Sequence, residues 1–451
     1  MKSVNRRSIL RRFSPRIIPG AVLVVSLIAG HSAALAQSSR SSDHWVGTWA
    51  TALVARPPTP QGQAPQGQAQ QAQVQQGQAA QAPRVVLNFN DQTLRQIVRI
   101  TLGGARLRVV VSNAWGTAPL PVGAAHVALQ AKGAAIAPNS DRALTFSGSP
   151  TTTIPAGAAV VSDPVTLSVP AFADLAIDLY LPGDTAASTS PLTTHGAGQQ
   201  PNYVSPTGNH TGAAEMPAIT TTQAWFFLAR VEVAAPEQVG AVVGIGDSIT
   251  DGARATANNR WLDHLARRLA GQNIKMGVMN AGIGGNQVLK DGNGVNALAR
   301  FDRDVLLQSG VTHVIVYEGI NDIRHEESTR TADLIAAHRQ LIERAHSRGL
   351  QVFGALLTPF EGSLFTPEHE AKRQALNDWI RTSKMYDGVI DFDSAVRDPS
   401  HPTQILPRFD SGDHIHPNDA GYEAMGNAID LQLFRAAPRP AAPLALNGRL
   451  R

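Results

Sequence analysis

Four short polar segments in the C-terminal half of the chain carry residue types suited to acyl-transfer chemistry. They span residues 246–250, 280–286, 319–322 and 413–418. Together they supply a serine, a glycine-rich turn, an asparagine, and a histidine with an aspartate three residues before it. A serine hydroxyl is a weak nucleophile and needs a base beside it, and the oxyanion that it creates needs hydrogen-bond donors. The four segments therefore contain each part that a serine acyl-transfer site requires.

Each of these parts has a predicted role. Ser248 is the candidate nucleophile, His416 is the base that accepts its proton, and Asp413 is the carboxylate that holds the histidine ring in the required tautomer. For the oxyanion hole we predict the backbone N–H groups of Ser248 and Gly285 and the side-chain amide of Asn321. Glycine suits position 285 because the backbone itself must approach the substrate oxygen.

Taken one at a time, the segments have simpler interpretations. Asp247 and Ser248 could only cap a helix, and residues 319–322 could be a turn after a strand. Asp413 and His416 could be a pair of metal ligands. The occurrence of all four segments in this order favours the catalytic interpretation, and no further His or carboxylate obviously completes a metal site. We therefore predict a site without metal or cofactor.

Three other polar residues are expected to play lesser parts. Asp247 and Asp322 are expected to be structural hydrogen-bond acceptors. His195, in a Thr-Thr-His-Gly sequence, could approach the site from the preceding part of the chain, but we expect a solvated loop histidine.

The pattern of apolar residues predicts the elements that position the site. From about residue 237 to 436, strand and helix patterns alternate, with strands expected at 240–246, 274–281, 313–318, 351–357 and 388–392. A helix is expected over 334–345 and another over roughly 418–434. Such alternation indicates an α/β fold with a parallel sheet covered on both faces. A 2-1-3 strand order would bring the first three polar segments to neighbouring strand ends, where ligands of open parallel sheets bind.

The preceding part of the chain has a different pattern of apolar residues. Between residues 85 and 233 apolar residues alternate with polar ones, as at Leu107, Val109 and Val111, and turn sequences separate the runs. This pattern predicts an all-β domain, a sandwich or jelly roll, over residues 37–236. A Gln-rich insertion at 57–84 is expected to be disordered, with wall attachment as the alternative, and residues 437–451 are expected to form a flexible tail.

The N-terminus is expected to be an export signal. Residues 1–36 hold six cations and no acids, an apolar run at 17–30, and an Ala-Leu-Ala sequence that ends at Ala36, before Gln37. Cleavage there predicts a periplasmic or secreted protein without a stable membrane span, whereas the alternative is an uncleaved anchor. Residues 5–11 are similar to a twin-arginine signal. The chain has no cysteine, which excludes disulfides and thiolate metal sites.

Charge and composition exclude some classes of partner. The formal net charge is +4, but without the signal segment the chain has 33 basic and 35 acidic residues, a balance of −2. A nucleic-acid partner is therefore not implied for the mature protein. Hydrophobic residues at 43% and charged residues at 16% of 451 positions describe an ordinary globular protein. Its oligomeric state does not follow from the sequence.

The four polar segments also carry a family resemblance. The Gly-Asp-Ser sequence at 246–248, Gly285, the Gly-x-Asn-Asp sequence at 319–322 and the Asp-x-x-His-Pro sequence at 413–417 resemble the four blocks of the SGNH (GDSL-type) serine hydrolases. The first block reads Asp-Ser-Ile-Thr, as in the lysophospholipase- and acetylesterase-like branch, and the resemblance extends over residues 239–434. It implies a flavodoxin-like three-layer α/β/α fold and a serine esterase in which Ser248, Gly285, Asn321 and His416 play the named parts.

The resemblance also indicates which class of substrate to expect. We expect a small-molecule or polysaccharide ester, with acylated, above all acetylated, carbohydrate favoured because β domains beside such enzymes often contact carbohydrate. Lipase-, lysophospholipase- or arylesterase-like activity is one alternative, and transfer of the acyl group to a glycan hydroxyl is another. A non-catalytic surface or binding protein that retains the fold is a third.

Overall fold

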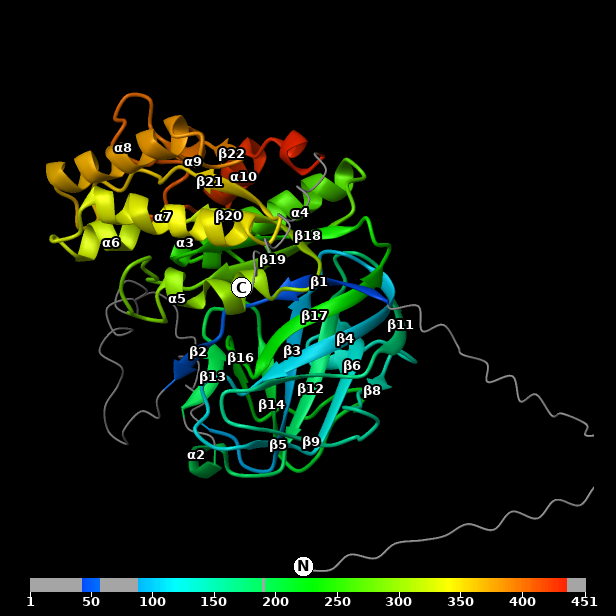
Figure 1. The fold of residues 1–451 in the computed structure, drawn as a ribbon. Helices are drawn as coiled ribbons and strands as arrows, with labels where there is room; N and C mark the ends of the chain where they lie inside the picture. The colour runs from blue at the N-terminus through cyan, green and yellow to red at the C-terminus, as the bar shows by residue number, and fades with distance from the viewer. Residues whose placement is uncertain (1–42, 57–87, 189–190, 436–451) are drawn as a thin grey trace, which may run out of the picture. The chain divides into compact units, whose positions relative to one another are not determined.

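The computed structural model describes residues 43–56, 88–188 and 191–435. The expected signal segment, the Gln-rich insertion at 57–84 and the tail at 437–451 lie outside the described residues. From Asp43 onward the chain is grouped as one compact unit. The predicted boundary between residues 236 and 237 marks the change from antiparallel to parallel sheet, and its status as a domain boundary stays a prediction (Figure 1).

The N-terminal part is rich in antiparallel sheet, as predicted. One sheet contains, in order, β1 (His44–Ala50), β17 (Leu228–Ala235), β4 (Gly104–Ser112) and β10 (Ala159–Val161), with β11 (Val165–Val169) also paired to β4. A second contains β15 (Thr220–Thr222), β14 (Asn202–Thr207), β3 (Gln92–Arg99), β12 (Asp174–Leu181), β6 (Ala124–Lys132) and β7 (Ala135–Ile136), with β8 (Arg142–Ala143) on β6. Smaller sheets join β16 (Trp225–Phe226), β13 (Leu192–His195) and β2 (Val54–Arg56), and β5 (Leu120–Val122) with β9 (Thr152–Ile154). A single-turn helix, α2 (Thr185–Ser188), follows β12.

The two large sheets share one hydrophobic core. Leu107 and Val109 of β4 and Leu175 and Ile177 of β12 are fully buried in the same cluster, although the two strands belong to different sheets. Alternate residues of each strand thus face the partner sheet, which is the physical origin of the period-two pattern in the sequence. Burial of these β-branched and leucine side chains is the main stabilising contribution in this part of the chain.

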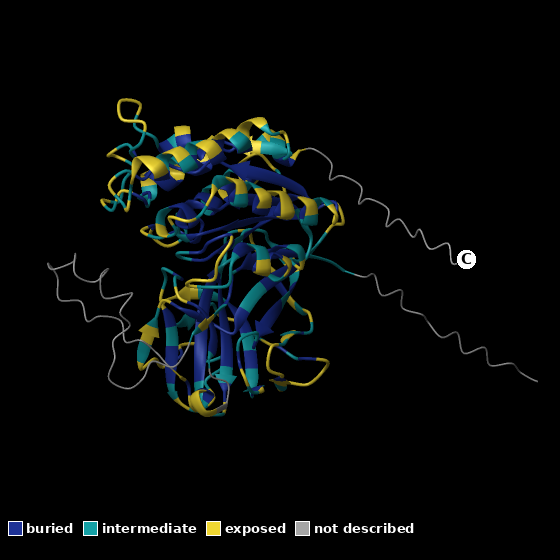
Figure 2. Cartoon of the chain, turned by 60° about the vertical axis from the view of Figure 1, so that its left-hand side comes forward, coloured by how far each residue is buried: buried dark blue, intermediate teal, exposed yellow. Residues whose placement is uncertain are grey.

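The C-terminal part is built on a five-stranded parallel sheet. Its strands lie in the order β19 (Met276–Gly282), β18 (Gly240–Gly246), β20 (Val311–Tyr317), β21 (Gln351–Ala355) and β22 (Gly388–Ile390). All seven residues of β18, an interior strand between β19 and β20, are buried, as expected for a strand covered on both faces (Figure 2). The order confirms the expected neighbourhood of the strand ends that follow β18, β19 and β20.

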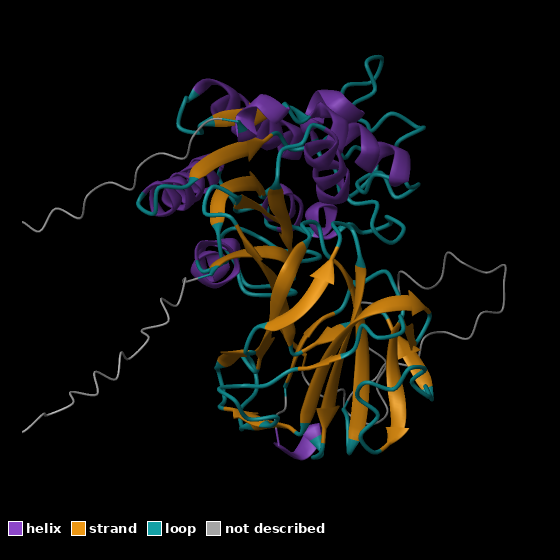
Figure 3. Cartoon of the chain, turned by 90° about the vertical axis from the view of Figure 1, so that its right-hand side faces the viewer, coloured by secondary structure: helices purple, strands orange, loops and turns teal. Residues whose placement is uncertain are grey.

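Helices gather around this parallel sheet, whereas the N-terminal part is almost entirely strands and loops (Figure 3). Contacts join α4 (Trp261–Gly271) and α9 (Phe392–Val396) to α10 (Asp419–Ala428), and separately join α5 (Ala297–Phe301), α6 (Ile320–His325), α7 (Thr331–His346) and α8 (Pro367–Thr382). The α/β class is thus observed, while the three-layer arrangement stays a prediction. Within the part of the chain that the structure describes, no helix combines the length and apolar character needed to cross a membrane.

The last helix is shorter than the sequence pattern predicted. We expected it over 418–434, but α10 ends at Ala428 because Ile429 has an extended backbone, with ψ 121°. A separate 3₁₀ helix, η2 (Leu431–Phe434), then follows, and Asp430 caps it by accepting a hydrogen bond from the Gln432 N–H.

The edge strand β19 lies against the N-terminal part. The hydroxyl of Thr101 accepts a hydrogen bond of 2.9 Å from the Val278 N–H and donates one of 3.2 Å to the Val278 carbonyl oxygen. Gly277 and Gly47 of β1 approach so closely that a Cβ at Gly277 would collide with the Gly47 carbonyl oxygen. The outer edge of the parallel sheet is therefore covered along this stretch.

Candidate active site

Ser248 begins a short helix directly after the interior strand β18. The helix α3 (Ser248–Asp251) starts where β18 ends, and the Asp247 side chain caps it by accepting a 2.9 Å hydrogen bond from the Ile249 N–H. The expected helix-cap interpretation of this segment is therefore correct, and it is compatible with catalysis because capping orients the turn that presents Ser248.

His416 reaches Ser248 from the loop that precedes α10. Its Nε2 lies 2.8 Å from the Ser248 Oγ, and its Nδ1 lies 2.8 Å from the Asp413 Oδ2. Because an ionised carboxylate only accepts hydrogen bonds, Nδ1 carries the hydrogen and Nε2 is free to accept the serine proton. The Asn418 side chain fixes the exit of this loop by capping α10 through the Gly421 N–H. The structure thus joins the three residues into one hydrogen-bonded chain.

Asp413 is held ionised by its neighbours. It accepts hydrogen bonds from the His416 N–H at 2.9 Å and from the Arg254 Nε at 3.0 Å. Partial burial favours the neutral acid, but the hydrogen bonds and charge of His416, together with Arg254, outweigh it and hold the pKa of Asp413 well below its usual range. The sequence analysis missed Arg254, because an arginine six residues after a serine belongs to no periodic pattern or motif.

Two of the three expected oxyanion donors are unengaged backbone groups. Among the described residues, neither the Ser248 N–H nor the Gly285 N–H donates a hydrogen bond to the protein. Gly285 has a φ of 74°, a left-handed conformation that favours glycine. Glycine is therefore needed here for backbone conformation as well as for close approach to a substrate.

Asn321 lies at the site, but its amide is turned toward the protein. Its Nδ2 donates to the Asp247 Oδ2 at 3.3 Å and to the Asn286 carbonyl oxygen at 3.0 Å. The side chain thereby joins the loop that carries Gly285 to the residue before Ser248. Its role as an oxyanion donor stays a prediction, and the structure adds a second role in holding these two loops together.

The two aspartates beside the site are buried hydrogen-bond acceptors. Asp322 accepts from the N–H groups of Val288 at 2.9 Å and Leu289 at 3.0 Å, which fixes the segment after the glycine-rich turn. Burial raises the pKa of Asp322 to about 6, against the lowering effect of these bonds. Burial likewise raises the pKa of Asp247 to about 6. These contacts match the structural roles expected from the sequence.

A buried arginine connects the strand ends beneath the site. Arg300 of α5 donates hydrogen bonds to the Gly246 carbonyl oxygen at 3.0 Å, to the Ala281 carbonyl oxygen at 2.6 Å and to the Asn286 Oδ1 at 2.9 Å. It also contacts Glu318, and both side chains are fully buried. Sequence reasoning missed Arg300, because a single arginine in a helix usually lies on a solvated face.

His195 is not the solvated loop histidine that we expected. It is the last residue of β13, only 4% exposed, and its Nε2 lies 2.9 Å from the Asp251 Oδ1 of α3. Burial occurs because strand pairing with β16 turns this residue toward the catalytic part of the chain.

The second histidine of the last polar segment has a separate partner. His414 Nδ1 lies 2.6 Å from the Asp410 Oδ2, and the side chain is 56% exposed. Both ring nitrogens of His416 are engaged within the triad, which leaves neither for a metal in this arrangement. Within the described ranges, no group of three or more His, Cys, Asp or Glu side chains is placed to hold a metal ion.

A parallel α/β sheet with a hydrogen-bonded Ser–His–Asp chain at the turn that follows β18 is the arrangement of a serine ester hydrolase. Residues 245–424 match the model of the GDSL-like Lipase/Acylhydrolase family. Among curated proteins, no sequence matches the chain.

Several solved structures are similar to part of the chain. A member of the lipolytic protein G-D-S-L family from Veillonella parvula is 18% identical, covers 42% of this chain and 94% of its own, and gives a TM-score of 0.34. Axe2, an acetylxylan esterase from Geobacillus stearothermophilus, is 20% identical, covers 44% of this chain and 97% of its own, and gives a TM-score of 0.34. The identification of the domain rests on the family match and on the triad geometry.

Proposed function

We propose that this protein is an exported carboxylic-ester hydrolase that works through an acyl-Ser248 intermediate. The observation that carries the proposal is the continuous hydrogen-bonded chain from Ser248 through His416 to Asp413, with both hydrogen-bond distances at 2.8 Å. Export is supported by the basic and apolar composition of residues 1–36 and by their Ala-Leu-Ala ending.

The reaction follows from the polarity of each group. His416 Nε2 accepts the Ser248 proton as Oγ bonds to the ester carbonyl carbon, and the negative charge moves to the carbonyl oxygen. The N–H groups of Ser248 and Gly285 are candidates to donate to that oxygen. On collapse, the bond from the carbonyl carbon to the alcohol oxygen breaks, and His416 gives its proton to the departing alkoxide. A water molecule then repeats the sequence on the acyl-serine, releasing the acid and restoring the serine.

Exposure of the site supports an ester carried on a large alcohol. The His416 side chain is 15% exposed and the Asp413 side chain 26% exposed, and Arg254 beside them is 43% exposed. A triad so close to the surface can meet an acyl group that projects from a polymer, which does not have to enter a deep tunnel. We therefore propose acylated, chiefly acetylated, carbohydrate or small esters as substrates.

The test compares wild-type protein with the Ser248→Ala variant. We expect the variant to lose about 10⁴-fold or more in kcat on a chromogenic acetyl ester, with an unchanged unfolding curve, and a fluorophosphonate to label only wild-type protein. A panel of chromogenic esters of increasing chain length, run beside acetylated polysaccharide, identifies the acyl and alcohol preference. Retention of more than about a tenth of the activity in the variant would remove Ser248 as the nucleophile.

A further inference from the structure

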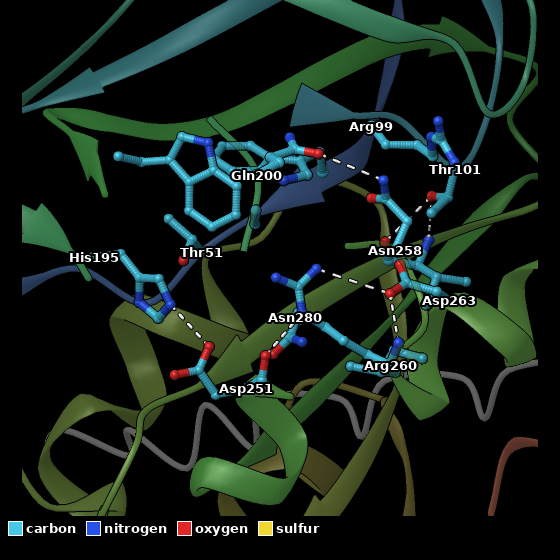
Figure 4. Close-up of a pocket in the computed structure, with 15 residues that line it drawn as sticks. Thr51, Arg99, Thr101, His195, Gln200, Asp251, Asn258, Arg260, Asp263 and Asn280 are labelled. Carbon is cyan, nitrogen blue, oxygen red and sulfur yellow. Dashed lines mark hydrogen bonds and ion pairs between the residues drawn. The ribbon is translucent and has the colours of Figure 1, made fainter. Parts of the chain in front are cut away.

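His195 connects the N-terminal part of the chain to the helix that carries the nucleophile. Its Nδ1 lies 2.8 Å from the Ala52 carbonyl oxygen. Its Nε2 lies 2.9 Å from the Asp251 Oδ1 (Figure 4). Both partners accept hydrogen bonds, so both ring nitrogens must donate and the ring carries a positive charge. The ring of Trp225 stacks on it at 5.8 Å between centroids, which excludes solvent from that face.

The surroundings of the ring favour this charged form. Burial lowers the pKa of His195, but the charge and hydrogen bond of Asp251, with the bond to Ala52, outweigh burial and raise it. The other charged group that faces the pair is Arg260, whose Nε donates to the Asp251 carbonyl oxygen at 2.7 Å and whose charge opposes protonation of the histidine. Asp251 is therefore the dominant partner.

Asp251 connects the histidine to both backbone donors of the candidate oxyanion hole. It is the last residue of α3, whose first residue is Ser248. Its Oδ2 accepts a 3.2 Å hydrogen bond from the Gly284 N–H, and Gly284 directly precedes Gly285. One carboxylate thus bridges the helix that presents one donor and the loop that presents the other.

The N-terminal part holds the same helix at a second point. Gln199 donates a hydrogen bond from its amide to the carbonyl oxygen of Gly252, the residue that ends α3. One contact comes from the last residue of β13 and the other from the segment that follows it, and both act on the end of a helix only four residues long. A helix this short has little stability of its own, so its orientation depends on such outside contacts.

We propose that His195 is a positioning residue for ester hydrolysis, because through Asp251 it sets the spacing between the Ser248 and Gly285 N–H groups. Oxyanion donors work only when each lies about 2.7–3.1 Å from the developing charge. A misplacement of about 1 Å can cost roughly 10²-fold in rate. The inference rests on the proposed acyl-Ser248 chemistry, and it gives the N-terminal part a direct function in catalysis.

Two substitutions separate this role from simple structural support. In His195→Asn the side-chain amide nitrogen overlies the Nδ1 position, so the bond to Ala52 is kept and the bond to Asp251 is lost. In His195→Gln the amide nitrogen overlies the Nε2 position, so the bond to Asp251 is kept. We expect the Asn variant to lose about 10- to 100-fold in kcat with KM within about threefold, and the Gln variant to stay within about fivefold of wild type.

His126 provides the matched control. It pairs with Asp141 at 2.9 Å within the N-terminal part, away from α3. Because this bond is made by Nδ1, His126→Gln loses it, and that variant should change the unfolding midpoint without changing kcat. If His195→Asn does not fold, Asp251→Ala gives the same test, because it removes the carboxylate that accepts from both His195 and the Gly284 N–H, and kcat should again fall at least tenfold.

Each result is read beside the Ser248→Ala variant. If Ser248→Ala stays active, the proposed nucleophile is wrong, whatever His195 does. If Ser248→Ala is inactive while His195→Asn matches wild type, or while His195→Asn and His195→Gln lose the same activity, the positioning role alone is overturned. A loss confined to His195→Asn, with KM preserved, supports it.

Discussion

Replacement of Asn321 by alanine tests the candidate oxyanion hole and its scaffold together. Truncation removes the amide that donates to the Asp247 Oδ2 and the Asn286 carbonyl oxygen, at 3.3 and 3.0 Å. Leaving a buried acceptor without a donor costs about 1–3 kcal/mol, so the two together predict a loss of about 2–6 kcal/mol in unfolding free energy. The variant no longer connects the residue before Ser248 to the loop that carries Gly285, and it lacks the amide predicted to donate to the oxyanion. We therefore expect kcat to fall by about 10²–10³-fold.

Asn377 offers a control of the same residue type and burial. It is fully buried in α8, donates to the Leu357 carbonyl oxygen at 2.9 Å and accepts from the Leu357 N–H at 2.8 Å, with no contact to the triad. Asn377→Ala should therefore lose a similar amount of stability, measured by urea unfolding, yet keep its kcat on a chromogenic ester. Both assays are run at a temperature where each variant is folded.

The aspartate variant makes the comparison sharper. In Asn321→Asp a carboxylate oxygen would replace Nδ2 and face two acceptors, Asp247 and Asn286, so the variant should be at least as impaired as alanine. A folded Asn321→Asp protein with near-normal kcat would refute the reasoning. An equal loss of kcat in Asn377→Ala would refute it too, because the effect would then be a general response to core damage.

Three further predictions follow from other contacts. His416→Ala should abolish turnover, whereas His414→Ala should lower kcat by less than about tenfold, because His414 pairs with Asp410 and not with the serine. An equal loss of kcat in both variants would show that the base is misassigned. Activity should survive exhaustive EDTA treatment, and a complete loss restored by zinc or manganese would favour the metal interpretation instead. Burial lowers the pKa of His338 to about 4, so between pH 6.5 and 4 the unfolded chain binds more protons than the folded protein and stability falls as pH falls. Between pH 7.5 and 4.5 the unfolding free energy of His338→Gln, measured in urea, should therefore decrease by about 2–3 kcal/mol less than that of wild type. Equal decreases in the two proteins would contradict this prediction.

The sequence predicted the elements of the parallel sheet well, for a physical reason. Strand β18 matches its predicted bounds, Gly240–Gly246, because a strand covered on both faces must be an unbroken apolar run. The meeting of Ser248, His416 and Asp413 was predictable as well, because the turn after β18 lies at the carboxyl edge of the sheet, where ligands bind, and these three residue types together have few other joint uses.

What sequence could not predict is the direction in which polar side chains point. Arg300, His195 and the amide of Asn321 all have partners that lie far from them along the chain, such as Gly246 for Arg300 and Asp251 for His195. No local pattern encodes such pairs, because each bond exists only once the packing of separate elements has placed its donor and acceptor together. The shortened α10 has the same origin, since propensity alone does not mark where its backbone turns.

The covered edge of β19 has a consequence for how this chain can be divided. Thr101 satisfies the N–H and carbonyl groups of Val278, and Gly47 lies against Gly277. A shortened protein that begins at residue 237 would keep all three triad residues but would present this edge to solvent, where open strand edges pair with other chains. Such a fragment is expected to self-associate rather than to behave as an independent domain. A fusion of this hydrolase to another protein would therefore have to include the preceding antiparallel sheets.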